Sequence, residues 1–343
     1  MQAGPIVGRS DLPSPLELSV KMMAETRGFD KSPPNAQYFA NAGKEYMEKY
    51  GAEPRDFAEI ARISHEHSQR NPYAQFQQAY TLEEIEKSPM IHFPLTKLQC
   101  SPTSDGAGAA VIVSEKFLAA RPHLRSQAIL MAGQALMTDS PQLYSKSSMD
   151  LVGYDMTKRA AAAALKEAGV TPKDITVTEL HDCFSCNELI LLEGLGFCEK
   201  GKAHEMVRRG DITYGGKGPI VNPSGGLISK GHPLGATGLA QCAELTWQLR
   251  GWANNRLVKN TDVALQHNLG LGGTVVITVY KRADGKKNSE ISNDEVKRTS
   301  QFDYNPAVEA RYVTKADGEK VRSKRYRKDY ALGDTLEKLE SRL

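Results

Sequence analysis

Imidazole and thiol side chains gather in three short, polar stretches of this chain of 343 residues. A neutral imidazole beside a thiol can accept its proton, and the resulting thiolate acts as a nucleophile or as a base. Imidazole and backbone N–H groups can also hold a developing oxyanion. The three stretches therefore predict nucleophilic or acid–base chemistry if the fold brings them together. Their candidate residues are His181, Cys183 and Cys186, then His232, and then His267 and Asn268.

The stretch around His232 is dense in glycine and proline, reading NPSGGLISKGHPLGATG over residues 222–238. Glycine allows positive φ and close backbone approach, and Pro233 suits the first turn of a helix. The apolar pattern from 239 to 249 predicts that helix. We therefore expect His232 just before a helix N-terminus, whose free N–H groups attract negative charge. The alternative is a tight loop in which the histidine only packs.

The order of elements between residues 93 and 283 predicts a layered α/β domain. A turn and small residues at 101–108 precede a β-rich apolar run, 109–113, and the polar stretch 267–273 reads as a turn. Ligands of such sheets bind at the carboxyl ends of strands, so the three stretches are expected to meet there. The predicted strands are 128–137, 174–180, 261–266 and 274–281, and the predicted helices are 148–169, one ending at 195, and 239–249.

The two ends of the chain differ from this middle. Helical patterns precede it at 16–26, 35–50, 53–69 and 82–87. Residues 284–343 are rich in charged residues and poor in aliphatic ones, which predicts an extended, partly disordered tail. The sequence therefore divides into segments at 1–92, 93–124, 125–283 and 284–343.

Composition excludes several classes of protein. The net charge of +3 is too balanced for nucleic acid as the main partner, and no run of about 18 apolar residues predicts a membrane span. Five cysteines, an odd number, argue for free thiols in a reducing compartment. The last three residues, Ser341-Arg-Leu343, are a conservative variant of the Ser-Lys-Leu peroxisomal address.

A metal site is not expected. Cys183-x-x-Cys186 is half of a zinc site, but a structural site needs four ligands and the sequence has no second such pair. Cys186 is instead expected to pack in the core. His65 and His67 lie two residues apart on a predicted helix, so they do not share a face.

The motifs resemble those of one family. Residues 225–238 resemble the Gly-His-Pro loop of thiolases, and His181-Asp-Cys-Phe184 resembles the variant found in sterol-carrier-protein-associated (SCP-x type) thiolases. The stretches 71–76, 102–106 and 267–273 also resemble that subfamily, and the similarity runs from about residue 36 to 282. On these motifs the chain is identified as a member of the thiolase superfamily.

The resemblance implies a thiolase-like layered α/β fold with a complete C-terminal half and a partial N-terminal half. It implies CoA-dependent cleavage of 3-oxoacyl-CoA in fatty-acid β-oxidation, with CoA as a substrate and no cofactor. His232 would activate the nucleophile and help to hold the thioester oxygen, and His181 would line the same oxyanion site. Cys183 would be the acid/base. His267 and Asn268 stand where other thiolases have Cys-x-Gly, and the backbone at Gly270 would support a second oxyanion site.

One departure from the family is important. Family members carry a nucleophilic cysteine in the N-terminal domain, and none of the five cysteines here has a matching context. The resemblance makes 1–92 the helical substrate-binding loop region, 93–124 a remnant of the N-terminal domain and 125–283 the C-terminal domain. We expect little activity from these 343 residues alone. The alternative is a non-catalytic protein that binds acyl-CoA or pairs with a thiolase.

Partners follow from the same resemblance. They are acyl-CoA and CoA, a second copy in a dimer or a full-length thiolase subunit, and the peroxisomal import receptor, with the peroxisome as location. With only part of the N-terminal half present, the outer face of the helix from Leu234 to Leu249 would stay open. That face would then be an interface or an aggregation risk.

Overall fold

The computed structural model describes residues 17–270, 273–300, 302–312 and 314–323. The chain divides into two compact units, Met1–Val308 and Glu309–Leu343. The first unit holds the sheet and all the candidate site residues. In the second unit, the described residues form helix α12, Lys315–Ser323.

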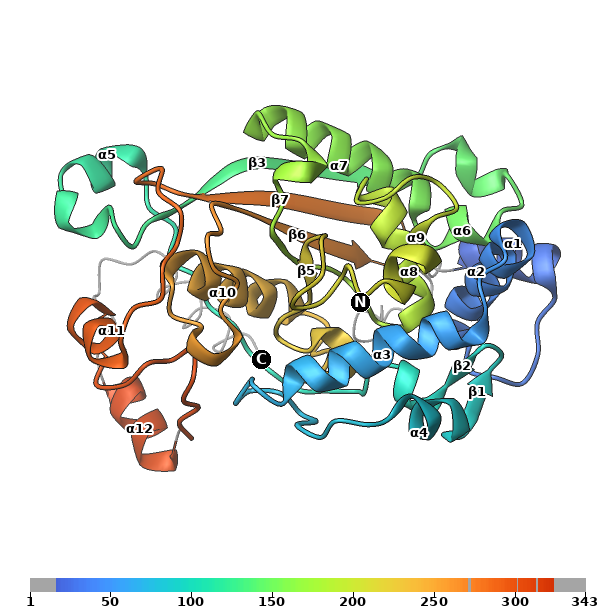
Figure 1. Cartoon of the computed structure of the whole chain (residues 1–343), viewed down its shortest axis with the longest axis horizontal. Coiled ribbons are helices and arrows are strands. Elements are labelled where there is room, and N and C mark those ends of the chain that lie inside the picture. The colour runs from blue at the N-terminus through green and yellow to red at the C-terminus, as the bar shows by residue number, and fades with distance from the viewer. Residues whose placement is uncertain (1–16, 271–272, 301, 313, 324–343) are drawn as a thin grey trace, which may run out of the picture. The chain divides into compact units, whose positions relative to one another are not determined.

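A mixed sheet of five strands forms the centre of the first unit (Figure 1). Its strand order is β3-β7-β6-β4-β5, with β7 antiparallel to β3 and β6, and β4 parallel to β5 and β6. Alternation of strands and helices along the chain produces this layered α/β arrangement, as predicted. The strands are β3 Ile129–Thr138, β4 Val177–Glu179, β5 Ile220–Val221, β6 Val263–Gly270 and β7 Thr274–Arg282.

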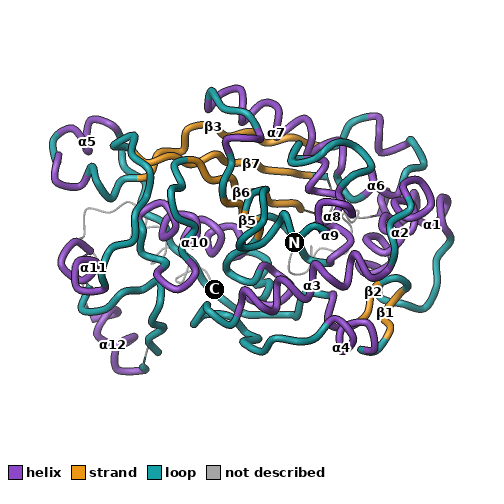
Figure 2. The backbone as a smooth tube through the Cα atoms, viewed as in Figure 1, coloured by secondary structure: helices purple, strands orange, loops and turns teal. Residues whose placement is uncertain are grey.

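Helices cover both faces of the sheet (Figure 2). Helix α7 packs on β3 and β7, and its backbone comes so close that a Cβ on Gly133 would lie 2.2 Å from the Ala164 carbonyl oxygen. Helix α10 packs on β6 and β4. The helices of this part are α5 Glu115–Ala119, α6 Ser148–Leu151, α7 Tyr154–Ala168, α8 Ser185–Gly194, α9 Ala203–Arg208, α10 Thr237–Arg250 and α11 Asn293–Ser300.

The N-terminal helices pack on the C-terminal part and share one core with it. Every residue of α8 is buried, its polar Asn187 and Glu188 included, and α2, α3 and α7 surround it. The predicted helices are confirmed here as α1 Glu17–Arg27, α2 Pro34–Tyr50, α3 Pro54–Ser68 and α4 Leu82–Lys87. A small hairpin follows them, formed by β1 Met90–His92 and β2 Leu95–Thr96.

Three predictions about elements outside the candidate site are wrong. The helix at 148–169 is broken at Gly153, where φ is +92°. The apolar run 109–113 is not a strand but a loop, and Val111 is 92% exposed, because none of the described strands pairs with it. Residues 284–308 are not an extended tail, since α11 buries Val296 against Trp252.

The outer face of α10 is partly open, as expected. Leu234 and Leu239 are 47% and 39% exposed. Residues 109–113 add further exposed aliphatic side chains, among them Val111, Ile112 and Val113. Among the described residues, no helix is long and apolar enough to span a membrane.

Candidate active site

Two of the three predicted stretches bring their imidazoles into contact. The rings of His181 and His232 meet edge to face, with centroids 4.9 Å apart and an interplanar angle of 89°. His181 follows the end of β4, and His232 precedes α10. The predicted meeting of these loops at the carboxyl end of a strand is therefore confirmed.

His232 is held as a neutral base. Its Nδ1 lies 2.7 Å from the Thr237 hydroxyl, and that hydroxyl donates to the Pro233 carbonyl at 3.1 Å. With the hydroxyl proton assigned to the Pro233 carbonyl, Nδ1 carries the ring proton and Nε2 keeps a lone pair. Among the described residues, none bonds to Nε2. Burial lowers the pKa of His232 to about 4, so this lone pair is available at neutral pH.

The backbone of His232 is fixed from the opposite side. Its N–H donates to the Ser104 hydroxyl at 3.1 Å, and Ser104 donates to the Gln75 side chain at 2.6 Å. Thr103 and His232 also form an isolated parallel bridge. Two segments that are remote in the sequence therefore position the histidine.

His181 is buried with an unsatisfied ring nitrogen. The residue is 7% exposed, and its Nδ1 has no hydrogen-bond partner. Burial lowers its pKa well below the usual range, and the nearby His232 and His267 rings add to the shift. A buried polar atom without a partner is costly in a folded protein. Its position beside His232 makes it a candidate donor or acceptor for a substrate oxygen.

His267 contacts the backbone of His181. It lies within β6 and not in a turn as predicted, because the ladder with β7 continues from Val263 to Gly270. Its Nδ1 accepts the His181 backbone N–H at 3.4 Å, and its Nε2 lies 3.0 Å from the Thr157 hydroxyl of α7. Both ring nitrogens are occupied, and burial lowers its pKa to about 3. This geometry suits a residue that positions His181 better than a residue that transfers protons.

Asn268 faces the other side of the sheet. Successive residues of a strand point to opposite faces, so Asn268 contacts α10, where its side-chain N–H donates to Gln241 at 2.7 Å. Gln241 in turn donates to the Leu180 carbonyl at 3.1 Å. Gly270 is the last residue of β6, paired with Thr274. The oxyanion role given to Asn268 and Gly270 stays a prediction.

Cys183 is a buried, protonated thiol. Burial raises its pKa well above the usual range, and the Asp182 carboxylate raises it further. The backbone carbonyl of Cys183 accepts the Ser101 N–H at 2.9 Å, which fixes the residue in place. Such a thiol is a poor nucleophile at neutral pH but a suitable proton donor. Cys186 is also buried and lies against Gly43, as a core residue would.

Sequence reasoning missed the scaffold behind the His232 loop. His65 on α3 lies 3.0 Å from the Ser229 hydroxyl, and His67 lies 3.1 Å from the Asn222 carbonyl and 2.7 Å from the Thr213 hydroxyl. The two histidines bond to different residues, as their spacing predicted. Among the described residues, no cluster of three metal-binding side chains occurs.

The titration of His67 gives a test of this scaffold. Burial lowers its pKa to about 4, from the usual histidine pKa of about 6.5. His67 therefore binds a proton below about pH 6.5 in the unfolded chain, but only below about pH 4 in the folded chain. Because the unfolded state binds more protons between these values, the free energy of unfolding decreases as the pH falls from about 6.5 to about 4. Relative to His67→Gln, the wild type is expected to lose about 2–3 kcal/mol between about pH 7 and about pH 4.5 in denaturant unfolding. The exposed His123→Gln variant is the control. The prediction would be contradicted if the wild type and His67→Gln differed in free energy of unfolding by the same amount at both pH values.

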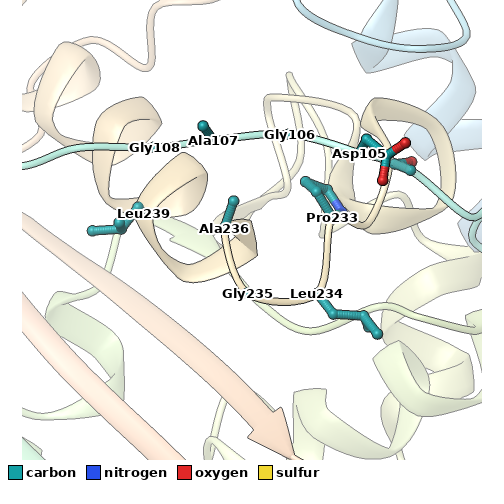
Figure 3. Close-up of a pocket in the computed structure, with 10 residues that line it drawn as sticks. Asp105, Gly106, Ala107, Gly108, Pro233, Leu234, Gly235, Ala236 and Leu239 are labelled. Carbon is teal, nitrogen blue, oxygen red and sulfur yellow. The ribbon is translucent and has the colours of Figure 1, made fainter. Parts of the chain in front are cut away.

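A groove of about 390 Å³ lies beside His232, between residues 104–108 and the start of α10 (Figure 3). Its walls approach closely, since a Cβ on Gly106 would lie 2.9 Å from Pro233 and one on Gly108 would lie 2.6 Å from Leu239. The lining is mixed, with Ser104 and Asp105 on one side and Leu234 and Ala236 on the other. The groove lies next to the His232 loop and offers both polar and apolar contacts to a bound group.

Comparison with known proteins identifies the class. Residues 138–282 match the family described as thiolase C-terminal domain-like, and the chain belongs to the thiolase superfamily. Within it, the chain is 54% identical over 274 residues to sterol carrier protein 2 of Gallus gallus. That match covers 80% of this chain and 50% of the relative. The chain therefore spans about half the length of this curated relative.

Solved structures agree on the fold. The Ltp2-ChsH2(DUF35) aldolase superposes with a TM-score of 0.63 and 27% identity, covering 72% of this chain and 63% of that one. Human mitochondrial 3-ketoacyl-CoA thiolase superposes with a TM-score of 0.51 and 20% identity, covering 71% of this chain and 59% of that one. The predicted thiolase-like α/β fold is confirmed.

Proposed function

We propose that this site forms and protonates the enolate of an acyl-CoA, in a thiolase-type cleavage of 3-oxoacyl-CoA in lipid metabolism. One observation carries the proposal: the buried, protonated Cys183 thiol follows His181, whose neutral ring meets that of His232. A thiol acid and neutral imidazoles suit a reaction at the carbon next to a thioester. Membership of the thiolase superfamily supports the substrate class.

The proposed steps follow from the states of these groups. A thiol attacks the C3 carbonyl of 3-oxoacyl-CoA. The C2–C3 bond then breaks, so that the C3 acyl group becomes a thioester of the attacking sulfur and the bonding electrons form the enolate of the remaining CoA thioester. The Cys183 S–H then protonates C2, and the imidazole of His181 holds the enolate oxygen. The Nε2 lone pair of His232 accepts the proton of the attacking thiol. None of the five cysteines stands in the sequence context of the family's nucleophile, so thiolysis by these residues alone is expected to be weak.

Deuterium exchange tests the acid–base half by itself, because it needs no nucleophilic cysteine. The purified 343-residue chain is incubated with acetyl-CoA in D₂O, and the mass of the acetyl group is followed. The proposal expects deuterium to enter C2 faster than in buffer. If acetyl-CoA binds by calorimetry but no deuterium enters, the chain is a non-catalytic acyl-CoA-binding protein instead.

Thiolysis is the second assay. Cleavage of 3-oxoacyl-CoA with free CoA is measured for the chain alone and with a full-length thiolase subunit. We expect little turnover alone and a gain with the subunit if the two associate. Analytical ultracentrifugation of the same samples tests the proposed dimer or mixed assembly.

A second candidate function is aldol-type cleavage. The superposition on an aldolase at 27% identity, and the absence of a matching nucleophile context, favour it, since retro-aldol cleavage needs no acyl-enzyme. A base would remove the 3-hydroxyl proton, the C2–C3 bond would break to a carbonyl and an enolate, and the Cys183 thiol would protonate C2. CoA-independent cleavage of a 3-hydroxyacyl-CoA would favour this reaction over thiolysis.

The peroxisome is the proposed location. Its support is Ser341-Arg-Leu343, which lies outside the described residues. A reporter carrying the last twelve residues, 332–343, is expected in peroxisomes in a manner that depends on the import receptor. A reporter that stays in the cytosol would contradict this.

A further inference from the structure

Three buried carboxylates lie next to the candidate site. The proposed reaction does not use them. Glu179, Asp182 and Glu188 are at most 1% exposed. Each accepts hydrogen bonds from the glycine-rich segment that leads to His232. Glu179 accepts the Ser224 N–H at 3.0 Å and its hydroxyl at 2.7 Å, Asp182 accepts the Leu227 N–H at 2.7 Å and the Ile228 N–H at 3.3 Å, and Glu188 accepts the Asn222 side chain at 3.0 Å.

Asp182 differs from the other two in its place along the chain. It stands between the two residues of the first site loop, His181 and Cys183, while its side chain reaches the second site loop. Leu227 and Ile228 belong to a π-helical turn, Gly226–Lys230, that ends two residues before His232. One carboxylate therefore ties the backbone that bears the thiol to the backbone that bears the base.

The backbone at Gly226 lies very close to the Asp182 carboxylate. Its φ is +59°, and a Cβ there would lie 2.1 Å from Asp182 Oδ2. A side chain at this position would be strained in the backbone and would displace the carboxylate. The glycine is thus explained by the approach of Asp182.

We infer that Asp182 is a positioning residue that holds the His232 loop against the His181–Cys183 loop, so that the two imidazoles meet at 4.9 Å. Its catalytic meaning rests on the proposed function, but its structural effect does not. Without its two bonds, the turn 226–230 loses its tie to the His181–Cys183 loop and keeps its contacts with α3, with residues 75–76 and, through Lys230, with Glu179.

The charged groups around Asp182 come from three elements. Glu179 lies on β4, Glu188 on α8 and Lys230 at the end of the turn, where its Nζ lies 3.5 Å from Glu179. The Cys183 thiol is the neighbour in sequence. Burial raises the pKa of Asp182 to about 7, against the effect of the two N–H bonds and Lys230. Because Asp182 takes up a proton in the neutral range, its titration gives a second measurement of its contact with Leu227 and Ile228.

Amide hydrogen exchange by mass spectrometry tests the inference without any assay of activity. In Asp182→Ala, peptides covering 226–232 are expected to exchange about tenfold or more faster, since bonds to a charged acceptor are lost. In Asp182→Asn the increase is expected to be smaller, because one acceptor oxygen remains. The control is Asp174→Ala, which removes a carboxylate that accepts the Thr171 N–H at 2.7 Å in a distant turn. It is expected to leave 226–232 unchanged.

Unchanged exchange of 226–232 in a folded Asp182→Ala protein would overturn the inference, and so would an equal increase in Asp174→Ala. If Asp182→Ala does not fold, Gly226→Ala and Asp182→Asn decide, and unchanged exchange in both would overturn it. The amide signals of Leu227 and Ile228 in nuclear magnetic resonance spectra are expected to titrate near pH 7 in the wild type and not in Asp182→Asn. If these results appear but acetyl-CoA takes up no deuterium, the proposed function fails and the inference stands.

Discussion

Replacing Cys183 by alanine is expected to slow deuterium uptake at C2 of acetyl-CoA by about 10²–10⁴-fold, the usual loss when a general acid or base is removed. The thiol is buried and lies two residues after His181, whose ring meets that of His232, and the proposal assigns the protonation of C2 to this thiol alone. Mass spectrometry of the acetyl group gives the rate. Folding is checked by circular dichroism and thermal unfolding.

Cys186→Ala is the matched control for this variant. Cys186 has the same chemistry, is also fully buried and lies three residues further along, but it packs against Gly43 in the core. We expect it to lose stability and to keep the exchange rate per folded molecule. Equal exchange rates in Cys183→Ala and the wild type would remove Cys183 from the mechanism.

Arg256→Met is expected to destabilise the protein by about 3–5 kcal/mol, because it leaves a buried carboxylate without its partner. The Arg256 and Glu244 side chains are 0% and 2% exposed, and two of their bonds measure 2.9 and 3.0 Å. Arg256 also donates to the Arg70 carbonyl at 3.1 Å and so joins α10 to the residues after α3. Denaturant unfolding measures the loss.

Two further variants separate this effect from ordinary surface electrostatics. Adding Glu244→Leu to Arg256→Met removes the unpaired charge and is expected to recover part of the stability. Lys87→Met breaks the exposed pair with Glu83, whose side chains are 74% and 72% exposed, and should cost at most about 1 kcal/mol. If Arg256→Met lowered the free energy of unfolding by less than about 1 kcal/mol, the prediction of a strongly stabilising buried ion pair would be contradicted.

Local signals made the helices predictable. Thr81 and Glu84 form a capping box at the start of α4, and Gly169 ends α7 in the left-handed conformation. These signals lie within a few residues of the boundary that they mark. The loop positions of His181 and His232 were predictable for the same reason, because each follows or precedes a regular element.

Pairing between remote segments was not predictable from local sequence. The polar residues of His267-Asn268 read as a turn, but β7 extends the ladder through them and their side chains find partners on opposite faces. The valines at 111 and 113 favour a strand, yet a strand needs a neighbour. Asp182 looks like a surface residue in sequence, and only the fold shows that it is buried under the His232 loop.

The ionisation of Cys183 tests the central claim most directly, since the proposed reaction needs this thiol as an acid. The ultraviolet absorbance of thiolate is titrated in the wild type, and the curve of Cys183→Ala is subtracted. The structure predicts that the Cys183 signal appears only at a pH above the range in which an ordinary cysteine ionises, because burial raises the pKa of this thiol well above its usual range. A Cys183 thiolate at or below pH 7 would contradict the account, because the residue would then be a nucleophile and not the proton donor of the site.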